Sequence, residues 1–329
     1  MTRHTDTPAG LPAAPALPVR TVEVAAVRRI SPRMVRVTLG GPELADFSYE
    51  APDQQVKLYF PKPGQTAPRL PETGADGDVM RWYGAFQAIP EDERPWTRSY
   101  TIRAHDPERG TVDIDFVLHD GAGVADSGGG DAVEGPATRW ARSAGPGDVL
   151  GMFGPSAYFA EPVPLGTTDW MLLAGDESAL PAIGTIIEAL PAGARAVAYV
   201  EVWDAAEEQR FESAGEVTVH WLHRAASAGG TSAGDGAAGG GAVGDGVSVD
   251  GLALVAAVRA AVFPAGSVYA WLGGEANAVR ALRRHLLGER GLDKRSVHFT
   301  GYWRRRLTHD DAPTEADLAE ARERLADRS

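Results

Sequence analysis

The feature of this sequence that most restricts its fold is a change in the spacing of apolar residues near residue 165. Before that point, the chain consists of short runs in which apolar and polar residues alternate. The clearest run, GTVDIDFVLH at 110–119, puts four apolar side chains on one face of a strand and Asp113 and Asp115 on the other. Alternation with a period of two, interrupted by Gly and Pro, is typical of an antiparallel barrel or sandwich. We place this first domain at residues 18–162.

The second half of the chain has a different pattern. Trp170 to Ala174 form an unbroken apolar run, as expected of a strand that is buried on both faces. A helical segment follows at about 178–190, and strands then alternate with helices up to the strand SVHFTGYW at 296–303. This order predicts a parallel sheet with helices on its faces, which is the α/β architecture of nucleotide-binding domains. We place the second domain at residues 163–305.

Four segments are expected to lie outside the regular elements of these domains. Residues 1–17 are rich in Pro, Ala and Thr and are expected to be a disordered tail, while 225–251 is a Gly-rich, flexible insertion. A second Gly-rich run covers 120–135. Residues 306–329 carry a capping-box pattern at Thr314 and Asp317, which predicts a C-terminal helical extension.

Composition excludes several classes of protein. The chain has no cysteine, so disulfides, thiolate metal sites and cysteine-held iron–sulfur clusters are excluded. A net charge of −13 argues against a nucleic-acid partner, which would favour a basic face. No apolar run approaches the roughly 18–20 residues that a membrane span needs. The N-terminus also lacks the apolar core of a signal peptide. We therefore expect a soluble, cytoplasmic protein, and a monomer.

The run RSYT at 98–101 is unusually polar for a strand. Arg98 and Tyr100 would project from one face, and Ser99 and Thr101 from the other. An arginine fork suits a pyrophosphate, and a tyrosine ring suits a flavin-like ring. A threonine hydroxyl or its backbone amide could bond a ring nitrogen. The alternative is a solvated strand that carries a surface arginine.

A second polar motif, GPATRWA at 135–141, follows the first Gly-rich run and is predicted to begin a helix. Pro136 suits the first helical position, and free backbone amides beside Thr138 would bind an anion. The phosphates of a dinucleotide cofactor are obvious occupants of such a site.

Seven motifs, in this order, resemble the siderophore-interacting protein family: RSYTIR, DFVLH, GPATRWA, PGDVLGMFGP, LLAGDESALPAI, WLGGEANAVRALRRHL and GYWRRR. The resemblance covers nearly the whole chain except the tail and the Gly-rich insertions. The GDESALPAI and GYWR pieces are quite specific to the family, whereas R-x-Y-T is shared across the ferredoxin-reductase-like superfamily. The resemblance implies an antiparallel β-barrel FAD domain, an α/β parallel-sheet domain for NAD(P)H, and a C-terminal helix.

The resemblance also implies positions for the cofactors. The R-x-Y-T strand would hold FAD, and the GPATRWA turn with His119 would support its ring and phosphates. The turn after the first parallel strand would face the nicotinamide nucleotide, although it is not a G-x-G-x-x-G turn, and Gly273 to Glu275 offer a second turn beside it. The implied cofactor contacts are Arg98, Ser99, Tyr100, Thr101, His119, Gly135, Pro136, Ala137, Thr138, Trp140, Gly175, Asp176, Glu177, Ser178, Gly274, Glu275 and Trp303. An ordinary αβ connection is the alternative for each turn.

A basic stretch, KRSVHFTGYWRRR at 294–306, stands out in this acidic chain. A solvated basic edge is the simplest explanation, but many ferric siderophores are anionic and a local cationic pocket would attract them. The resemblance implies that Lys57, Arg304 and Arg305 contact the siderophore. Two departures affect the detail of these sites: Arg306 stands where the family usually has glycine, and the 120–135 loop expands a link that is usually short.

The resemblance implies an enzyme in which FAD passes electrons from NAD(P)H to a ferric siderophore and so releases Fe(II). No protein metal site is expected. The predicted strand AVAYVEVWDAAEE ends with Glu201 and Asp204, and acids there would favour the ribose diol of NADH over the 2′-phosphate of NADPH. The C-terminal helix also resembles the branch of the family associated with NADH. Two alternatives stay open: a non-catalytic ferric-siderophore binding module, and a flavin reductase component that feeds another acceptor.

Overall fold

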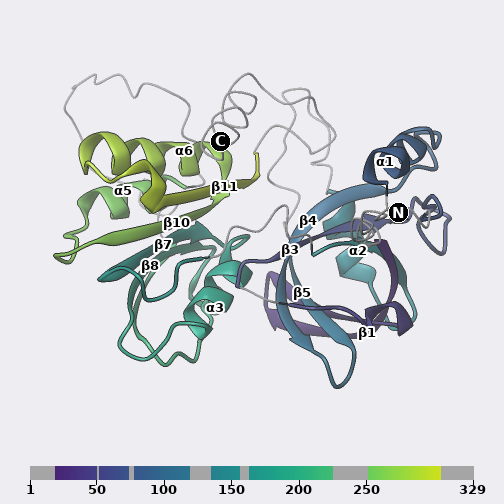
Figure 1. The fold of residues 1–329 in the computed structure, drawn as a ribbon, viewed down its shortest axis with the longest axis horizontal. Coiled ribbons are helices and arrows are strands. Elements are labelled where there is room, and N and C mark those ends of the chain that lie inside the picture. The colour runs from purple at the N-terminus through teal and green to yellow at the C-terminus, as the bar shows by residue number, and fades with distance from the viewer. Residues whose placement is uncertain are drawn as a thin grey trace, which may run out of the picture.

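The fold is given by a computed structural model that describes residues 19–49, 52–73, 78–118, 135–155, 163–224 and 251–304. Along this part of the chain a barrel is followed by an open sheet, and the two lie side by side in Figure 1. Both predicted domain types are therefore confirmed. The predicted tail, nearly all of both Gly-rich segments and the C-terminal helical extension lie outside the described residues.

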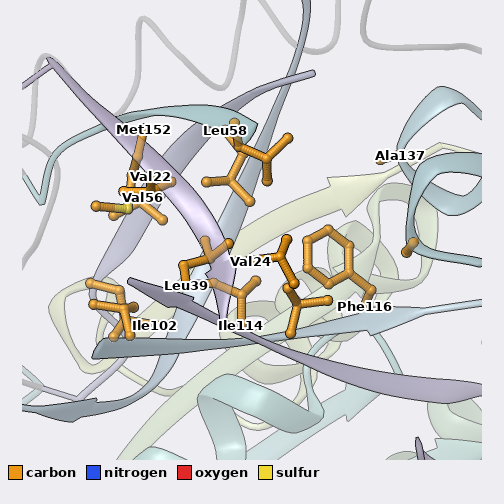
Figure 2. Packing of buried hydrophobic residues seen from close by; sticks show 14 of the residues in the cluster. Val22, Val24, Leu39, Val56, Leu58, Ile102, Ile114, Phe116, Ala137 and Met152 are labelled. Atoms are coloured by element: carbon orange, nitrogen blue, oxygen red, sulfur yellow. The ribbon is translucent and has the colours of Figure 1, made fainter. Parts of the chain in front are cut away.

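Antiparallel strands form a closed barrel in the order β1-β2-β5-β4-β3-β6. The alternating pattern correctly predicted its interior, because Val112, Ile114 and Phe116 of β5 are fully buried. Figure 2 shows apolar side chains of the barrel strands meeting there, with Ala137 of helix α2 beside them. The element bounds are β1 Val19–Ser31, β2 Met34–Gly40, β3 Gln55–Phe60, β4 Trp96–Asp106, β5 Thr111–Val117, α2 Pro136–Ser143 and β6 Val149–Phe153.

Helix α1 (Val79–Gln87), between β3 and β4, was not predicted. Asp78 caps it by accepting hydrogen bonds from the backbone N–H groups of Met80 and Arg81, at 3.0 and 3.1 Å. Trp82 and Phe86 are four residues apart, so they share one face of the helix and pack on the barrel. The helix was missed because this one pair is weak evidence for a helix beside the strand patterns that precede and follow it.

Parallel strands form the second domain in the order β11-β10-β7-β8-β9. All residues of β7 are buried, as the unbroken apolar run predicted. Helix α3 packs on one face of the sheet, and helices α5 and α6 pack on the other (Figure 1). The bounds are β7 Trp170–Asp176, α3 Leu180–Glu188, β8 Arg195–Val202, β9 Glu216–His223, α5 Leu252–Ala260, β10 Val268–Glu275, α6 Ala276–Arg284 and β11 Val297–Trp303.

The second domain covers part of the outer face of the barrel. Met34 of β2 belongs to the core cluster around α3, not to the barrel core. The side chain of Asp115 on β5 is only 1% exposed, and Arg36 donates two hydrogen bonds to it at 2.7 and 2.8 Å. Arg103 of β4 lies 3.9 Å from Asp115 and donates to both carboxylate oxygens of Glu188 in α3. At this interface, the polar face of the strands therefore meets protein instead of water.

Candidate functional site

Strand β4 divides the RSYT run between two environments, as the alternation predicted. Leu58 of β3 pairs with Arg98, and Lys57 pairs with Ser99. Arg98 and Tyr100 are half-buried on the barrel side, where Tyr100 packs against the core. Ser99 lies on the other face beside Lys57, and both of these side chains are exposed.

An aromatic group surrounds Tyr100. The rings of Phe60, Phe116 and Trp140 form a connected set with it, the shortest centroid distance being 4.4 Å between Tyr100 and Phe116. Burial of the Tyr100 hydroxyl raises its pKa well above the usual range, and the nearby guanidinium of Arg98 opposes part of that rise. A cation therefore lies next to a phenol ring at the edge of the barrel.

Helix α2 has no side-chain cap at its N-terminus within the described residues. Gly135 is the N-cap residue and offers no side chain to the first turn, Pro136 occupies the predicted first position, and the turn holds no acidic residue. Ala137 and Thr138 are buried against the barrel. No side chain in the described part of the chain caps the amides of this turn, an arrangement that suits a phosphate oxygen.

Asp176 organises the end of strand β7 and is 4% exposed. Its carboxylate accepts hydrogen bonds from the backbone N–H of Ser178 at 2.9 Å and from the Ser178 hydroxyl. It also accepts from the backbone N–H of Glu275 at 2.8 Å and from the indole N–H of Trp303 at 2.9 Å. One side chain thus joins the two predicted strand-to-helix turns to the C-terminal strand β11.

Glycines allow these turns to approach each other. Gly175 of β7 pairs with Gly273 of β10, and a Cβ on Gly175 would lie 2.7 Å from the Gly273 carbonyl oxygen. Gly274 has a φ of 131°, a conformation that favours glycine, and a Cβ there would meet the Asp176 carboxylate at 2.6 Å. Both positions therefore require glycine.

Two acidic residues of the turns differ in their hydrogen bonding. Glu275 caps helix α6 by accepting from the backbone N–H groups of Asn277 and Ala278 at 2.8 and 2.9 Å, and burial raises its pKa. Glu177 is 6% exposed and accepts from Arg224 through Oε1, but its buried Oε2 has no hydrogen-bond partner in the described part of the chain. That orphaned oxygen can accept a hydrogen bond from an amide N–H or a hydroxyl of a ligand.

Glu201, which the sequence suggested as a ribose contact, is not available for that role. It is fully buried at the end of β8, and accepts hydrogen bonds from the backbone N–H of Gly251 at 2.8 Å and of Leu254 at 3.0 Å. Arg224 lies 3.8 Å from it. Glu201 therefore caps α5 and holds both flanks of the Gly-rich insertion, so of the two acids only Asp204 still supports NADH.

Glu201→Gln is expected to lower the free energy of unfolding by about 2–3 kcal/mol, because the new amide group turns an N–H towards a buried N–H donor. Urea unfolding followed by tryptophan fluorescence measures this change. Glu216→Gln is the matched control, since its exposed pair with Arg195, at 3.7 Å, should change stability by less than about 0.5 kcal/mol. Equal effects of the two substitutions would contradict the capping role.

The remaining predicted site residues have different outcomes. Trp303 is half-buried on β11, where it meets Asp176, and Arg304 is half-buried just after it. His119 and Arg305 lie outside the described residues. Sequence reasoning missed Asp53 and Tyr302, which meet at the domain interface. Tyr302 lies in the GYW motif, but no local pattern marked Asp53.

The residues present fit a flavin adenine dinucleotide. Arg98 and the N-terminus of α2 offer positive charge for a pyrophosphate, Tyr100 and Trp140 offer aromatic surface, and Thr101 offers a hydroxyl. The orphaned Oε2 of Glu177 suits a second ligand at the turns. The described residues contain no group of His, Cys, Asp and Glu that could hold a metal ion, and none of their helices is long and apolar enough to span a membrane.

Comparisons with known proteins agree with this geometry. A model for the siderophore-interacting FAD-binding domain matches residues 23–159, and the model called siderophore-interacting protein matches 168–306. The crystal structure of a siderophore utilization protein from T. fusca is 37% identical, covers 90% of this chain and 97% of its own, and has a TM-score of 0.66.

Two curated relatives carry functional names. Ferric vibriobactin reductase ViuB of Vibrio cholerae is 28% identical over 87% of this chain and 89% of its own. The NADPH-dependent ferric-chelate reductase of Escherichia coli is 28% identical over 86% of this chain and 92% of its own. With both domain models in the expected order on a barrel and a parallel sheet, the chain belongs to the siderophore-interacting protein family.

Proposed function

We propose that this protein is an FAD-dependent reductase that takes electrons from NAD(P)H and reduces a ferric siderophore, so that Fe(II) is released. The observation that carries the proposal is the meeting of the two half-sites. Gln55 of β3, which pairs with Thr101 of β4, donates a hydrogen bond to the Tyr302 hydroxyl of β11 at 3.4 Å, and the neighbouring Trp303 donates to Asp176. A short series of hydrogen bonds therefore links the residues suited to flavin with those suited to a nicotinamide nucleotide. The printed names of the two curated relatives support the reductase assignment.

Bound flavin supplies the conversion of a two-electron hydride donor into single-electron transfer to iron. The chain supplies binding and orientation. Arg98 and the α2 amides would neutralise the pyrophosphate, and Tyr100 with Trp140 would fix the ring at the barrel edge. Asp176 would keep the nucleotide turn at that ring. Ferrous iron is held less tightly by oxygen-rich chelators than ferric iron, so reduction favours release.

The nicotinamide donor would bind at the turns after β7 and β10. Glu177 Oε2 is the group there that lacks a partner among the described residues, so it would accept a hydrogen bond from the nucleotide. Of the two acids that favour NADH as the donor, Asp204 is the one still available. It is half-buried and caps a short 3₁₀ turn by accepting from the backbone N–H of Ala206 at 2.8 Å. Rates with NADH and NADPH, measured side by side, decide this point.

The test of the proposal is the visible spectrum of the purified protein under anaerobic conditions. Flavin bands should bleach with NADH or NADPH and return when a ferric siderophore is added, as a ferrous-iron trap gains colour. Bound flavin that bleaches but is reoxidised only by a ferredoxin would favour a reductase component of another system. A protein that binds ferric siderophore but neither carries nor takes up FAD would be a binding module, and the proposal would be wrong.

Lys57→Ala is expected to raise the KM for an anionic ferric siderophore about tenfold with little change in kcat, because one cation near the flavin is worth about 1.4 kcal/mol to a nearby anion. The Lys57 side chain is exposed, and neighbouring protein partly desolvates the ammonium and lowers its pKa. Lys62→Ala removes the same charge beyond the end of β3, where it stacks on Trp96 at 4.3 Å, and serves as the control. A neutral ferric chelate should not distinguish Lys57→Ala from the wild type.

A further inference from the structure

Asp53 of the first domain forms hydrogen bonds with three elements of the second domain. Its backbone N–H donates to the hydroxyl of Thr185 in α3 at 3.1 Å. Its carboxylate accepts from the indole N–H of Trp271 in β10 at 2.8 Å and from the hydroxyl of Tyr302 in β11 at 3.1 Å. Its φ of 63° is a left-handed conformation, which is uncommon for a residue other than glycine. Such a conformation persists where the surrounding contacts fix it, as they do here.

Both carboxylate contacts of Asp53 lead to the turns at which the nicotinamide nucleotide is proposed to bind. The ring of Trp271 packs so closely against Gly273 of the same strand that a Cβ on Gly273 would lie 2.5 Å from it. The residue after Tyr302 donates its indole N–H to Asp176 at 2.9 Å. Asp53 therefore contacts the two strands, β10 and β11, that support the nucleotide turns.

The backbone beside Asp53 belongs to the strand that adjoins the proposed flavin site. The carbonyl oxygen of Gln54 accepts a hydrogen bond from the backbone N–H of Ile102 in β4 at 2.8 Å. Gln55 begins β3 and pairs with Thr101, and β3 then lies beside the whole R-x-Y-T run. Asp53 is therefore joined to the flavin side by the backbone and to the nucleotide side by its carboxylate.

The ion pair between Arg103 and Glu188 also joins the two domains, but at a different place. Arg103 donates to both carboxylate oxygens of Glu188, which is the last residue of α3. The turn after β7 leads into the first residue of that helix, Leu180, at the opposite end. This pair therefore joins the domains away from the nucleotide turns.

We propose that Asp53 is a positioning residue for hydride transfer: its carboxylate holds β10 and β11 against the barrel and so fixes the nucleotide turns relative to the flavin. This inference rests on the proposed function, because it needs FAD on the barrel and a nicotinamide nucleotide at the turns. The step breaks a C–H bond of the reduced nicotinamide and forms an N–H bond on the flavin ring, so the nicotinamide is oxidised by two electrons and the flavin is reduced. The reacting atoms must come nearly into contact, which makes the step sensitive to the placement of the two domains.

The test is the anaerobic rate at which NADH or NADPH reduces bound FAD in the full-length Asp53→Asn variant, followed by stopped-flow absorbance. Asparagine tolerates the left-handed backbone, but its amide N–H would face one of the two donors, so one hydrogen bond is lost. A misplacement of about 1 Å can cost about 100-fold in rate, and we expect flavin reduction to slow at least about tenfold. Ferricyanide should reoxidise dithionite-reduced flavin at the wild-type rate, because that reaction does not use the nucleotide turns.

Matched variants separate positioning from a general loss of interdomain contact. Glu188→Gln removes the charge of the other carboxylate at the interface and should leave the rate of flavin reduction unchanged. Trp271→Phe removes one donor to Asp53 and should slow reduction by a factor similar to that of Asp53→Asn. Asp53→Gly keeps the left-handed backbone and removes both carboxylate bonds, so adding Trp271→Phe to it should cause no further loss.

A measurement on the protein without FAD or nucleotide tests the same contact. Hydrogen–deuterium exchange of peptides from β11 should be about tenfold faster in Asp53→Asn than in the wild type, because the interface opens more often. Peptides from β1 should exchange at the wild-type rate. Unchanged exchange in β11 would show that Asp53 does not hold this strand, and the inference would be wrong.

The outcomes distinguish this inference from the proposed function. A wild-type protein that does not bind FAD, or whose FAD is not reduced by either nucleotide, overturns both. Wild-type reduction with an unchanged rate in Asp53→Asn, or an equal loss in Glu188→Gln, overturns the inference and leaves the proposed function in place. If the Asp53 variants do not fold, Trp271→Phe decides by the same measurement, and an unchanged rate there overturns the inference.

Discussion

Asp176→Ala is expected to lower the free energy of unfolding by about 3–5 kcal/mol and to abolish binding of the nicotinamide nucleotide. The buried carboxylate accepts from two N–H groups of the turns, from the Ser178 hydroxyl and from the Trp303 indole. Each buried donor left without a partner costs about 1–3 kcal/mol, although donors near the edge will find water. The turns after β7 and β10 would then lose their common anchor. Urea unfolding measures the first effect and titration with NADH and NADPH the second.

Two further substitutions make this prediction specific. Asp176→Asn keeps one acceptor oxygen but turns an amide N–H towards the other donors, so it should lose about half as much stability as the alanine variant. Asp204→Ala also removes a carboxylate from a turn, but that side chain is half-buried and accepts from one backbone N–H, of Ala206. Its cost should be about 1 kcal/mol. If Asp176→Ala cost no more than Asp204→Ala, the anchoring role would be wrong.

Gly175→Ala is the second substitution with a large expected effect. The new methyl carbon would lie 2.5 Å from the Cβ of Ala179 and 2.7 Å from the backbone oxygen of Gly273. The backbone contact cannot be relieved by a side-chain rotation, so β7 must shift against β10. We expect a loss of about 3 kcal/mol, at the upper end for overpacking by one methyl group, and weaker binding of the nicotinamide nucleotide.

Gly84→Ala is the matched control for this change. Gly84 lies in helix α1, and a Cβ there would have nothing within 4 Å. Alanine is the better helix former, so this variant should gain about 0.5–1 kcal/mol. The same Gly→Ala change is thus expected to lower the free energy of unfolding at Gly175 and to raise it at Gly84. Thermal or urea unfolding of both variants compares the two effects directly. A Gly175→Ala variant as stable as the wild type would show that the two strands are not closely packed there.

The sequence was sufficient to predict the fold class because, in both domains, the spacing of apolar residues along each strand matches which of its residues are buried. Period-two alternation identified the barrel interior at Val112, Ile114 and Phe116, and the unbroken run from Trp170 identified a strand buried on both faces. Pro136 correctly predicted the start of α2. The candidate site followed less from patterns than from family motifs, and which of its residues bind cofactor stays a prediction.

What only the tertiary structure decided is the role of polar residues at contacts between distant segments. Asp115 alternates as a solvent-facing residue should, yet it is buried beside Arg36 and Arg103, and Arg103 in turn pairs with Glu188 of the second domain. Glu201 lies at the end of a strand, as a ribose-binding acid would, yet it caps α5. Asp53 carries no local signal because its partners lie more than 100 residues away. The spacing of apolar residues indicates which face of a helix or strand packs on the core of its own domain. What covers the opposite face depends on how distant parts of the chain pack together, which local spacing does not show.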